Sequence, residues 1–380
     1  MSEPTAYQRA GVDTHAGDRA IELMRKDVLA THRGRVPGGV GGFAGFFDAE
    51  FLTGYRHPLL VAATDGVGTK VAIAQALDRH DTIGQDLVAM VIDDIVVSGA
   101  TPLFLTDYIA CGKVVPERIA AIVSGISRAC LAAGVAVVGG ETAEHPGILG
   151  EDEYDVAAAA TGVVEADEVL RPESVRTGDV VVALGSSGLH SNGYSLARHI
   201  IAENGLSLDQ AVPGSTRSLG EELLEPTLVY TPLVLDLLER DRAGIRIFSH
   251  VTGGGIAQNL QRVLPKTAAV TLDRSRWSPP AIMRALTEWG GVNLTDVEDT
   301  WNMGIGFFAV VDHQSVDRVI DSSRQAGIDA FVAGEIVDAD SLPDREGFLT
   351  GGKGVSGGFV RLVGDYADSS SSSSSTAHLS

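Results

Sequence analysis

The six residues from Asp65 to Lys70, DGVGTK, combine a carboxylate, two glycines and a lysine. Gly66 and Gly68 have no side chains, so the backbone N–H groups of this turn can approach an anion closely. Lys70 would add a mobile positive charge at the end of the turn. The segment therefore indicates an anion-binding turn beside a carboxylate, the composition expected where a metal ion accompanies a phosphate.

More carboxylates lie on a predicted helix from Gly84 to Gly99. Asp86 and Asp93 are seven residues apart, about two helical turns, so both fall on one face, and Asp94 lies beside them. All could be ordinary solvated carboxylates. However, the helix is apolar nearly all round and should be buried, where a carboxylate needs a partner or a metal. With the glycine turn, these side chains favour a magnesium–polyphosphate site.

Two histidines adjoin glycine-rich turns that follow predicted strands. His190 lies in GSSGLHSNGYSLAR, where Ser191 or Asn192 can cap the next helix, and a helix N-terminus can bind an anion. His250 begins the sequence HVTGGG. Each histidine either makes a structural hydrogen bond or transfers a proton, because the unshifted pKa of histidine is about 6.5. Both interpretations stay open from the residues alone.

Two other segments, both in the N-terminal half of the chain, are also rich in glycine. In GGETAEHPG, from Gly139 to Gly147, the glycines free the backbone, and Glu141 is expected at the end of a strand, where α/β sites usually form. Pro37 to Gly45, PGGVGGFAG, is the densest glycine cluster. It is either a flexible loop or a loop that closes over phosphate.

Several familiar sites are excluded or disfavoured. The chain contains no GxxxxGK[ST] sequence, so ATP would not be held by a Walker loop. Gly304 to Ala309 matches GxGxxA, but it continues as a strand rather than opening a helix, which argues against dinucleotide binding. The serines around His190 form no GxSxG elbow, so a hydrolase is disfavoured.

Composition narrows the class of protein further. The chain has 380 residues, 44% of them hydrophobic, and a formal net charge of −21, which argues against nucleic acid and anionic membrane surfaces as partners. Cys111 and Cys130 are the two cysteines, so no disulfide framework is implied. With no signal peptide and no apolar run long enough for a membrane helix, we expect a cytoplasmic protein.

The elements that must position these residues alternate between strands and helices. An N-terminal arm (1–17) precedes a predicted ATP-binding domain (18–165), and a polar segment (165–178) separates it from a predicted substrate domain (178–345). The serine-rich end (365–380) is expected to be disordered. The first domain reads as mixed α/β. Its predicted strands are 59–64, 102–110, 135–138 and 154–164, and its predicted helices are 18–31, 84–99 and 116–133.

Taken together, the motifs resemble the phosphoribosylformylglycinamidine cyclo-ligase family, also called aminoimidazole ribonucleotide (AIR) synthetase. Any one motif is weak, but six in the family's order are specific. Sister families with the same fold make other products, and GGETAEHPG and SSGLHSNGYSL resemble the cyclo-ligase rather than these relatives. The matching stretches are GGVGGF, DGVGTK, HDTIGQDLVAM, GGETAEHPG, SSGLHSNGYSL and HVTGGG.

The resemblance implies a fold and a reaction. The fold would be an N-terminal mixed-sheet domain that dimerises by forming a barrel between subunits, plus an α+β C-terminal domain, with the active site in the cleft between them. The reaction would use ATP, with Mg²⁺ and often K⁺, to cyclise formylglycinamidine ribotide into AIR and release ADP and phosphate. ATP would phosphorylate the formyl oxygen to an iminophosphate, and an amidine nitrogen would then displace phosphate.

The resemblance also assigns residues. Asp65, Gly66, Gly68, Thr69, Lys70, Asp94, Gly140 and Glu141 would bind the nucleotide, and Asp65, Asp94 and Glu141 its metal. Ser191, Asn192, Thr252, Gly253 and Gly254 would lie toward the substrate. The candidate catalytic residues are Lys70 and, as the base, His190 or His250.

Three features depart from the family pattern. Members commonly have Asn where this chain has Asp93, and a lysine where it has Arg25 followed by Lys26. The serine-rich tail is also outside the pattern. Two other functions stay open, a sister phosphotransferase with a different acceptor and a non-catalytic binding relative.

Overall fold

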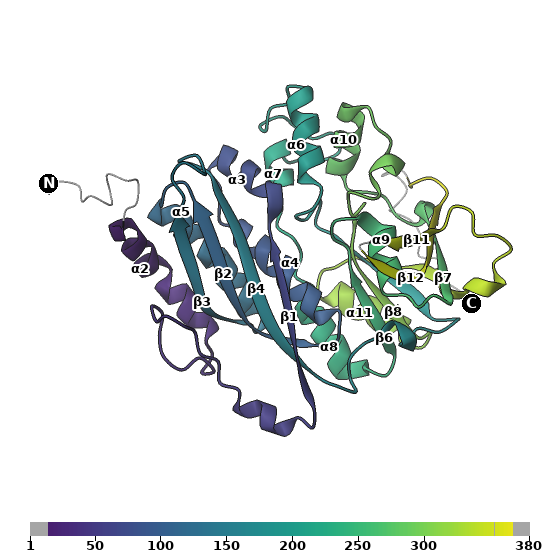
Figure 1. Ribbon diagram of the computed structural model, residues 1–380. Helices are drawn as coiled ribbons and strands as arrows, with labels where there is room; N and C mark the ends of the chain where they lie inside the picture. Colours follow the sequence, from purple (N-terminus) through teal and green to yellow (C-terminus); the bar gives the residue numbers. More distant parts are fainter. Residues whose placement is uncertain (1–13, 353, 368–380) are drawn as a thin grey trace.

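A computed structural model describes residues 14–352 and 354–367 (Figure 1). Within these residues the strands form three four-stranded sheets, ordered β1-β4-β2-β3, β6-β8-β5-β9 and β10-β7-β12-β11. The first sheet belongs to the N-terminal part of the chain and the other two to the C-terminal part (Figure 1). The predicted fold class, two domains of mixed α/β and α+β content, is confirmed.

The N-terminal sheet is mixed. Strand β4 pairs antiparallel with both β1 and β2, whereas β2 pairs parallel with β3 at one edge. Side chains of β4 alternate between buried and exposed from Tyr154 to Ala160, as expected for a sheet covered on one face. The strands are β1 (Pro58–Gly66), β2 (Thr101–Cys111), β3 (Ala136–Glu144) and β4 (Tyr154–Glu165).

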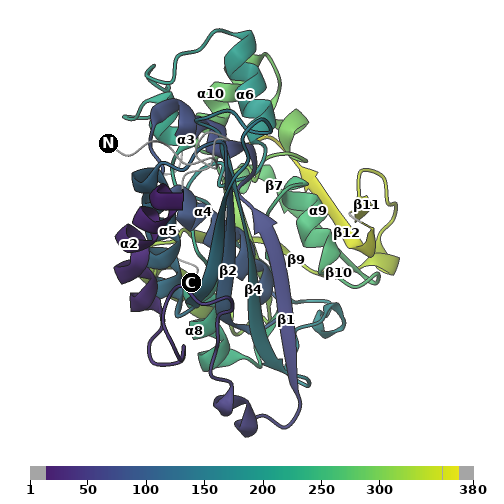
Figure 2. The same cartoon turned by 60° about the vertical axis from the view of Figure 1, so that its left-hand side comes forward.

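Helices cover one face of this sheet (Figure 2). Helix α5 shows why the boundaries lie where they do, because Pro116 occupies its first turn and Gly134 follows it at φ 76°, a conformation that suits glycine. Helix α4 is almost fully buried between the sheet, α5 and the C-terminal domain. The helices that cover the sheet are α2 (Thr14–Thr31), α4 (Ile83–Val96) and α5 (Pro116–Ala133), whereas the short α3 (Val71–Leu77) contacts α7.

The opposite face of the N-terminal sheet carries exposed side chains. On β1, Leu60 is 66% exposed, and on β2 Tyr108 is 42% exposed. Alanines 157 and 159 of β4 are exposed between these two strands. This open and partly apolar face is unusual for a sheet, because one face of a sheet normally packs on a core and the other is polar.

The central sheet of the C-terminal part is β6-β8-β5-β9, and it is antiparallel throughout. One face packs on α8 and α11 in an apolar cluster that includes Val182, Phe307 and Leu237. Its elements are β5 (Val180–Gly185), β6 (Ile245–His250), β8 (Ile305–Val311), β9 (Ala330–Glu335), α8 (Thr231–Asp241) and α11 (Val316–Gln325).

The second C-terminal sheet is β10-β7-β12-β11, and its strand β7 contacts β9 of the central sheet. Strand β12 lies beyond residue 345, where the predicted domain ended. The strands are β7 (Ala268–Asp273), β10 (Val337–Asp338), β11 (Leu349–Gly352) and β12 (Val355–Val363). The remaining helices are α6 (Tyr194–Glu203), α7 (Leu219–Leu223), α9 (Gly255–Arg262) and α10 (Ala281–Gly290).

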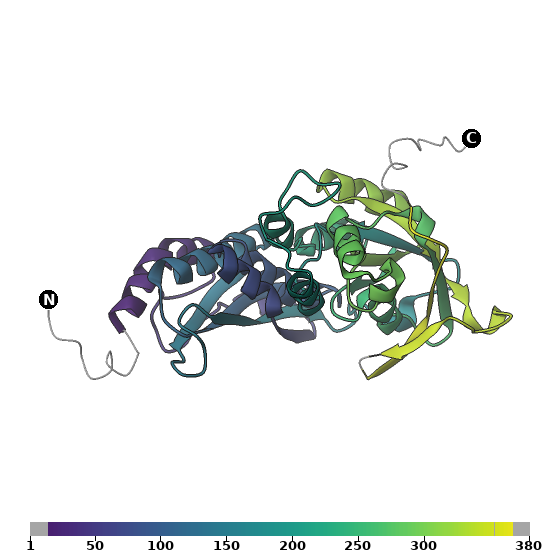
Figure 3. The same cartoon turned by 90° about the horizontal axis from the view of Figure 1, so that it is seen from above.

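Seen from above, the two parts lie side by side along the length of the molecule (Figure 3). The predicted N-terminal arm falls largely on residues 1–13, outside the described residues, and α2 already begins at Thr14. Most of the predicted serine-rich tail, 368–380, is outside them too. Among the described residues, no helix is long and apolar enough to span a bilayer.

Candidate active site

The DGVGTK turn lies at the junction of the two domains. Strand β1 ends at Gly66, and residues Gly68–Lys70 form a short 3₁₀ turn, η2. Gly68 has φ +70°, a left-handed conformation that favours glycine. The Thr69 hydroxyl is 3.3 Å from that of Ser195 in the C-terminal domain. The turn predicted to bind an anion therefore lies against α6, and the hydrogen bond from Lys70 to the His190 carbonyl joins it to the loop before that helix.

Lys70 differs from the sequence-based expectation of a mobile charge, which is wrong in this structure. Its side chain is fully buried, and Nζ donates to Asp86 Oδ1 (2.8 Å), to the His190 carbonyl (3.0 Å) and to the Glu225 carbonyl (2.6 Å). Burial lowers the pKa of Lys70, and the charge of Asp86 opposes that effect. An ammonium group has three donors, so these acceptors occupy all of them.

The prediction that Asp86 and Asp93 share one face of α4 is confirmed, but their partners are protein groups. Asp86 Oδ1 also accepts from the backbone N–H and hydroxyl of Thr227, at 2.8 and 2.7 Å. Asp93 accepts from the Tyr230 N–H at 3.0 Å and from the N–H and hydroxyl of Thr231 at 2.8 and 2.7 Å. Burial raises the pKa of Asp93 to about 6. These two carboxylates fasten the C-terminal domain to α4, with Asp93 capping α8.

Asp94, one residue further along α4, instead reaches a predicted catalytic residue. Its Oδ1 is 2.9 Å from Nδ1 of His250, which stands at the end of β6. The Asp94 side chain is 45% exposed, whereas that of His250 is 2% exposed. Burial lowers the pKa of His250, but the hydrogen bond and charge of Asp94, with the charges of Asp93 and Asp65, outweigh burial and leave the pKa raised.

The other nitrogen of His250, Nε2, is buried and has no hydrogen-bond partner among the described residues. Since Nδ1 donates to Asp94, Nε2 carries the free lone pair in the neutral ring. A histidine oriented by a carboxylate, with an unpaired lone pair on its second nitrogen, has the arrangement of a general base. It spans the domain junction, because Asp94 and His250 come from different domains.

His190 is in a different chemical state. It has φ +61°, it is 1% exposed, and its Nε2 accepts a hydrogen bond from the Ser187 N–H at 3.2 Å. Burial lowers the pKa of His190 well below its usual range, and the positive charges of His250 and Lys70 act in the same direction. The neutral ring of His190 is therefore strongly favoured, and its lone pair, on Nε2, already accepts the hydrogen bond from Ser187.

The predicted substrate residues come together beside these histidines. A Cβ atom on Gly253 would lie 3.3 Å from Oδ1 of Asn192, so the two glycine-rich loops are adjacent. The Ser191 hydroxyl is buried 3.2 Å from that of Thr227. Gly254 has φ +99° and caps α9. Asn259 holds this turn by donating to the Thr252 carbonyl at 3.1 Å.

Glu141 does not join Asp65 and Asp94. It lies within β3 rather than at the end of a strand, contrary to the prediction. Strand pairing places Asp65, Asp107 and Gly140 in one row across the sheet, so Glu141, the next residue, points to the opposite face. The described residues contain no cluster of three or more acidic, histidine or cysteine side chains suited to a metal. The predicted metal set is therefore not assembled within one chain.

Gly140 and Glu141 instead line a cavity of about 280 Å³. Its walls are α2, β3 and the glycine loop 39–45, and Asp107 faces it. Gly140 leaves room for the Asp107 carboxyl, because a Cβ at position 140 would lie 2.2 Å from Asp107 Oδ1 and would displace it. Burial raises the pKa of Asp107 to about 7. Apolar side chains of α2 and the glycines of loop 39–45 line the cavity together, a combination that suits a ring with an attached anionic group.

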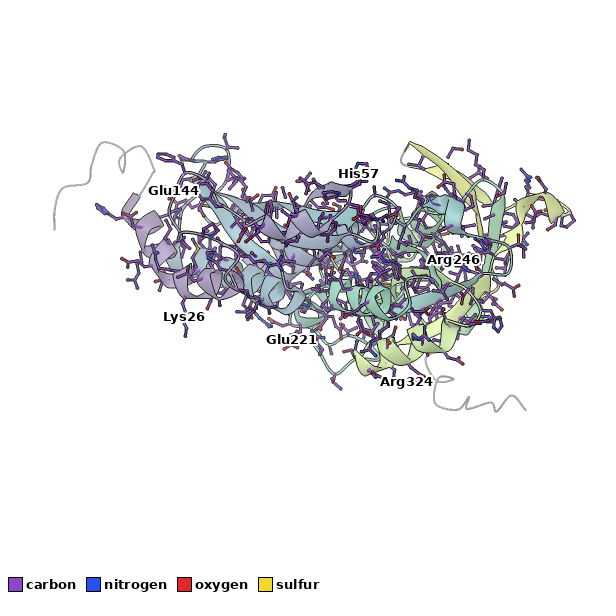
Figure 4. All side chains as sticks on the ribbon, turned by 90° about the horizontal axis from the view of Figure 1, so that it is seen from below. Lys26, His57, Glu144, Glu221, Arg246 and Arg324 are labelled. Carbon is purple, nitrogen blue, oxygen red and sulfur yellow. The ribbon has the colours of Figure 1, made fainter. Side chains whose placement is uncertain are left out.

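The two cations of α2 that depart from the family pattern, Arg25 and Lys26, do not line this cavity. Arg25 and Lys26 are exposed, and the Lys26 side chain points away from the domain (Figure 4). The helix lines the cavity with apolar side chains such as Ala20 and Met24. Neither side chain is therefore in position to contact a phosphate group bound in this cavity.

Sequence reasoning missed several residues that shape the site, above all Thr227, Trp301 and Asn302. Thr227 anchors Asp86, and the other two contact the loop of His190. The only signal for Trp301 and Asn302 was the sequence Trp301-Asn302-Met303-Gly304 before β8, which matches no mechanistic motif.

Comparison with known proteins gives a consistent result. The family model for the N-terminal domain of AIR synthase related protein matches residues 48–164, and the model for the C-terminal domain matches residues 176–343. A phosphoribosylformylglycinamidine cyclo-ligase from Geobacillus kaustophilus is 47% identical over 332 residues, covering 87% of this chain and 95% of the relative. One from Desulfitobacterium hafniense is 45% identical over 331 residues, covering 87% and 96%.

Solved structures share the fold at low identity. Thiamine-monophosphate kinase from Stenotrophomonas maltophilia superposes with a TM-score of 0.60 at 19% identity, over 92% of this chain and 97% of the kinase. The hydrogenase maturation protein HypE gives 0.60 at 15% identity, over 87% and 92%. HypE in complex with ATP gives 0.56 at 16% identity, over 88% and 87%.

Proposed function

Because this chain belongs to the phosphoribosylformylglycinamidine cyclo-ligase family, its reaction is the ATP-dependent cyclisation of formylglycinamidine ribotide to AIR, and we propose how its residues carry that reaction out. It is a ligase of purine biosynthesis that uses ATP. The observation that carries the proposal is the Asp94–His250 pair, which joins the two domains where the DGVGTK turn meets the substrate loops.

The chemical difficulty is that an amide oxygen is a poor leaving group. In the proposed sequence, the formyl oxygen attacks the γ-phosphorus of ATP, ADP departs and the formamide N–H proton is released to solvent, which leaves an iminophosphate. An amidine nitrogen then attacks the former formyl carbon, a C–N bond forms, and the C–O bond breaks as phosphate leaves. One proton must be removed from that nitrogen as the ring closes.

We assign that proton to His250 rather than His190. His250 Nε2 has no partner among the described residues, whereas His190 Nε2 already accepts from Ser187. Asp94 would orient the His250 ring and stabilise the imidazolium that forms, as a carboxylate does for a catalytic histidine. General-base assistance of this kind typically contributes about 10²–10⁴-fold in rate.

Mg²⁺ fits the carboxylates at the junction. The Asp94 side chain is half-exposed beside His250, the charge of Asp65 acts on the same histidine, and hard oxygen donors suit this ion. Mg²⁺ usually takes one or two carboxylates and completes its shell with phosphates and water, so a third carboxylate is not required. Bound there with ATP, the ion would neutralise charge on the transferring phosphoryl group. A role for K⁺ stays a prediction.

We place the nucleotide's base and ribose in the cavity beside α2. Apolar α2 side chains would contact the base, and the N–H groups of loop 39–45 would face phosphate oxygens. Gly140 and Glu141 border the same cavity, which retains their proposed role in nucleotide binding. Lys70 acts differently in this proposal, since it fixes the position of the turn and does not touch ATP.

We further propose that the enzyme is a cytoplasmic homodimer joined through the open face of the N-terminal sheet. The exposed Leu60 and Tyr108 on that face support it, because large apolar side chains on a sheet face usually mark an interface. Joining two such sheets would form the barrel between subunits that the resemblance implies.

The proposal is tested by ADP release from ATP in the presence of formylglycinamidine ribotide, with and without Mg²⁺. We expect release that requires both the ribotide and the ion, with AIR formed in equal amount. Thiamine monophosphate serves as the control acceptor for a sister phosphotransferase. ADP release with that acceptor alone, or none with any acceptor, would contradict the proposed function.

A further inference from the structure

Two of the proposed substrate residues, Ser191 and Asn192, lie in the loop from Ser186 to Gly193, which precedes α6. It has little regular structure, yet His190 adopts a left-handed conformation at φ +61°. A non-glycine residue keeps a left-handed backbone conformation only where contacts with the surrounding structure hold it there. Lys70, Pro226 and Thr227 contact the middle of the loop. Both of its ends are held by one segment, Trp301–Gly304, which contains none of the residues assigned to chemistry.

Asn302 holds the first end of the loop. Its side chain is buried, Nδ2 donates to the Gly188 carbonyl at 2.9 Å, and Oδ1 accepts from the Ser186 hydroxyl at 3.1 Å. Oδ1 also accepts from the Gly304 N–H at 2.9 Å, and the Gly304 carbonyl accepts from the Ser186 N–H at 2.9 Å. One asparagine thus joins the loop to the start of β8.

Trp301 holds the other end of the loop. Its indole is fully buried, and Nε1 donates to the Gly193 carbonyl at 3.1 Å. Gly193 has φ +74°, and a Cβ there would lie 2.2 Å from Cδ1 of Trp301, so the ring packs directly on the backbone. Any larger residue than glycine would displace either the ring or the loop.

The holding segment is itself strained. Met303 has φ +51° and Gly304 has φ +94°, so two successive residues are left-handed, and a non-glycine residue there costs about 1–2 kcal/mol. The Met303 carbonyl accepts from the Trp277 indole at 3.1 Å, and Asn302 caps the Gly304 N–H. These contacts hold the turn in one conformation. The hydrogen bonds of Trp301 and Asn302 to the loop therefore start from fixed positions.

The same stretch of chain also reaches the second glycine turn. The carbonyl of Glu298 packs so closely on Gly255 that a Cβ would not fit there. Gly253 in that turn adjoins Asn192 of the loop. Contacts from residues 298–304 therefore set both loops that would face the substrate.

We propose that Trp301 and Asn302 are positioning residues, which hold the loop Ser186–Gly193 in the geometry that binds formylglycinamidine ribotide. The inference rests on the proposed function for the identity of that substrate. Neither residue lines the cavity in which we place the nucleotide, so their loss should affect the ribotide and spare ATP. Misplacement of a bound substrate by about 1 Å can cost about 10²-fold in rate.

The direct test measures the loop without using activity. Hydrogen–deuterium exchange of the full-length protein compares wild type with Asn302→Ala, Trp301→Phe and the control Ser323→Ala. Ser323 is fully buried, and its hydroxyl donates to the Val319 carbonyl within α11, away from the site. We expect amides of residues 187–192 to exchange about 10-fold faster in both test variants, with α4 unchanged and the control like wild type. Unchanged exchange at 187–192 in Trp301→Phe would overturn the proposal, even if Asn302→Ala fails to fold.

The second test separates positioning from general destabilisation. Trp301→Phe keeps the ring packing and removes one hydrogen bond, so kcat/KM for the ribotide should fall about 10-fold, and Asn302→Ala should lose about 100-fold. The KM for ATP should stay within twofold of wild type in both. An equal rise in both KM values, or a loss no larger than that of Ser323→Ala, would contradict positioning. If wild type releases no ADP with the ribotide, the proposed function fails, and the exchange result still decides the positioning claim.

Discussion

His250 and His190 are both buried beside glycine turns, but their ring nitrogens have different partners. Asp94 orients His250 from the opposite domain, and the pKa of His250 is raised despite burial. His190 accepts from a backbone N–H, and burial and two neighbouring positive charges depress its pKa. From the sequence these two residues were equal candidates for the base, so only the hydrogen-bond partners distinguish them.

His250→Asn should lower kcat by about 10²–10⁴-fold while the KM for ATP stays near the wild-type value, because the base is lost but the nucleotide contacts are not. His190→Asn is the matched comparison, since asparagine tolerates the left-handed backbone at position 190. It should lose less than His250→Asn at pH 7.5. Steady-state kinetics with the ribotide and ATP measures both. Wild-type turnover in His250→Asn would remove His250 from the chemistry.

Asp107 gives a prediction about pH and stability. Burial raises its pKa to about 7 in the folded state, above the value of about 3.9 in the unfolded chain. The protonated group therefore contributes stability that is fully present below about pH 4 and is lost as pH rises through 7. Relative to Asp107→Asn, the free energy of unfolding of wild type should fall by about 1–3 kcal/mol between pH 4 and 8. This is less than the full pKa shift implies, because the carboxyl faces a cavity that water can enter. Chemical denaturation across that range tests it, and parallel pH curves for the two proteins would contradict it.

At the scale of elements, helix α4 is the element that joins the two domains. Its apolar residues pack in the N-terminal core, and its carboxylates Asp86 and Asp93 bind the segment from Thr227 to Thr231. Because the two carboxylates are two helical turns apart, they bind the segment from Thr227 to Thr231 at two points and so fix its direction along α4. The position of Asp94 toward His250 follows from this double attachment.

Lys70→Met tests whether the buried Lys70–Asp86 pair is a structural fastening. Removing the lysine leaves Asp86 charged and buried, so the free energy of unfolding should fall by about 3–5 kcal/mol. Adding Asp86→Asn to that variant should recover part of the loss. The control is Arg240→Met, which removes an exposed i,i+4 pair worth about 0.3–0.5 kcal/mol. Stability equal to that of the control, together with lost ATP binding, would restore Lys70 as a nucleotide contact.

The elements show which patterns a sequence reveals. Helix α5 was predicted with its observed bounds, because Pro116 and the residue after Ala133 give clear start and stop signals. Strand β3 was predicted to end at Val138, since Gly139 and Gly140 look like a turn, but pairing with β2 carries the strand on to Glu144. Strands β11 and β12 were missed, because their glycine-rich sequence lacks a period-2 pattern.

At the scale of the molecule, the partners that decide side-chain roles come from distant parts of the chain. Lys70 binds the carbonyl of residue 190, and Asp86 binds residue 227. Local periodicity placed the acids on one face of a helix but gave no information about what would meet that face. The resemblance to a family supplied the two-domain fold, and the geometry then corrected the expected mobility of Lys70 and the expected position of Glu141 at a strand end.

The open sheet face gives a prediction for the assembly. Leu60→Glu should convert a dimer into monomers at micromolar concentration, because it places a charge in an apolar interface. Leu29→Glu is the control, since Leu29 is 41% exposed on α2, away from that face. Sedimentation velocity distinguishes the states. A wild-type monomer, or a dimer unaffected by Leu60→Glu, would contradict the proposed interface.

The central claim is that the domain junction brings the γ-phosphate of ATP to the formyl oxygen, so that this oxygen leaves with the phosphate. Formylglycinamidine ribotide labelled with ¹⁸O in the formyl group tests it most directly, with mass analysis of the inorganic phosphate after turnover. We predict one ¹⁸O atom in each phosphate released. Unlabelled phosphate, with the label recovered in water, would contradict the account.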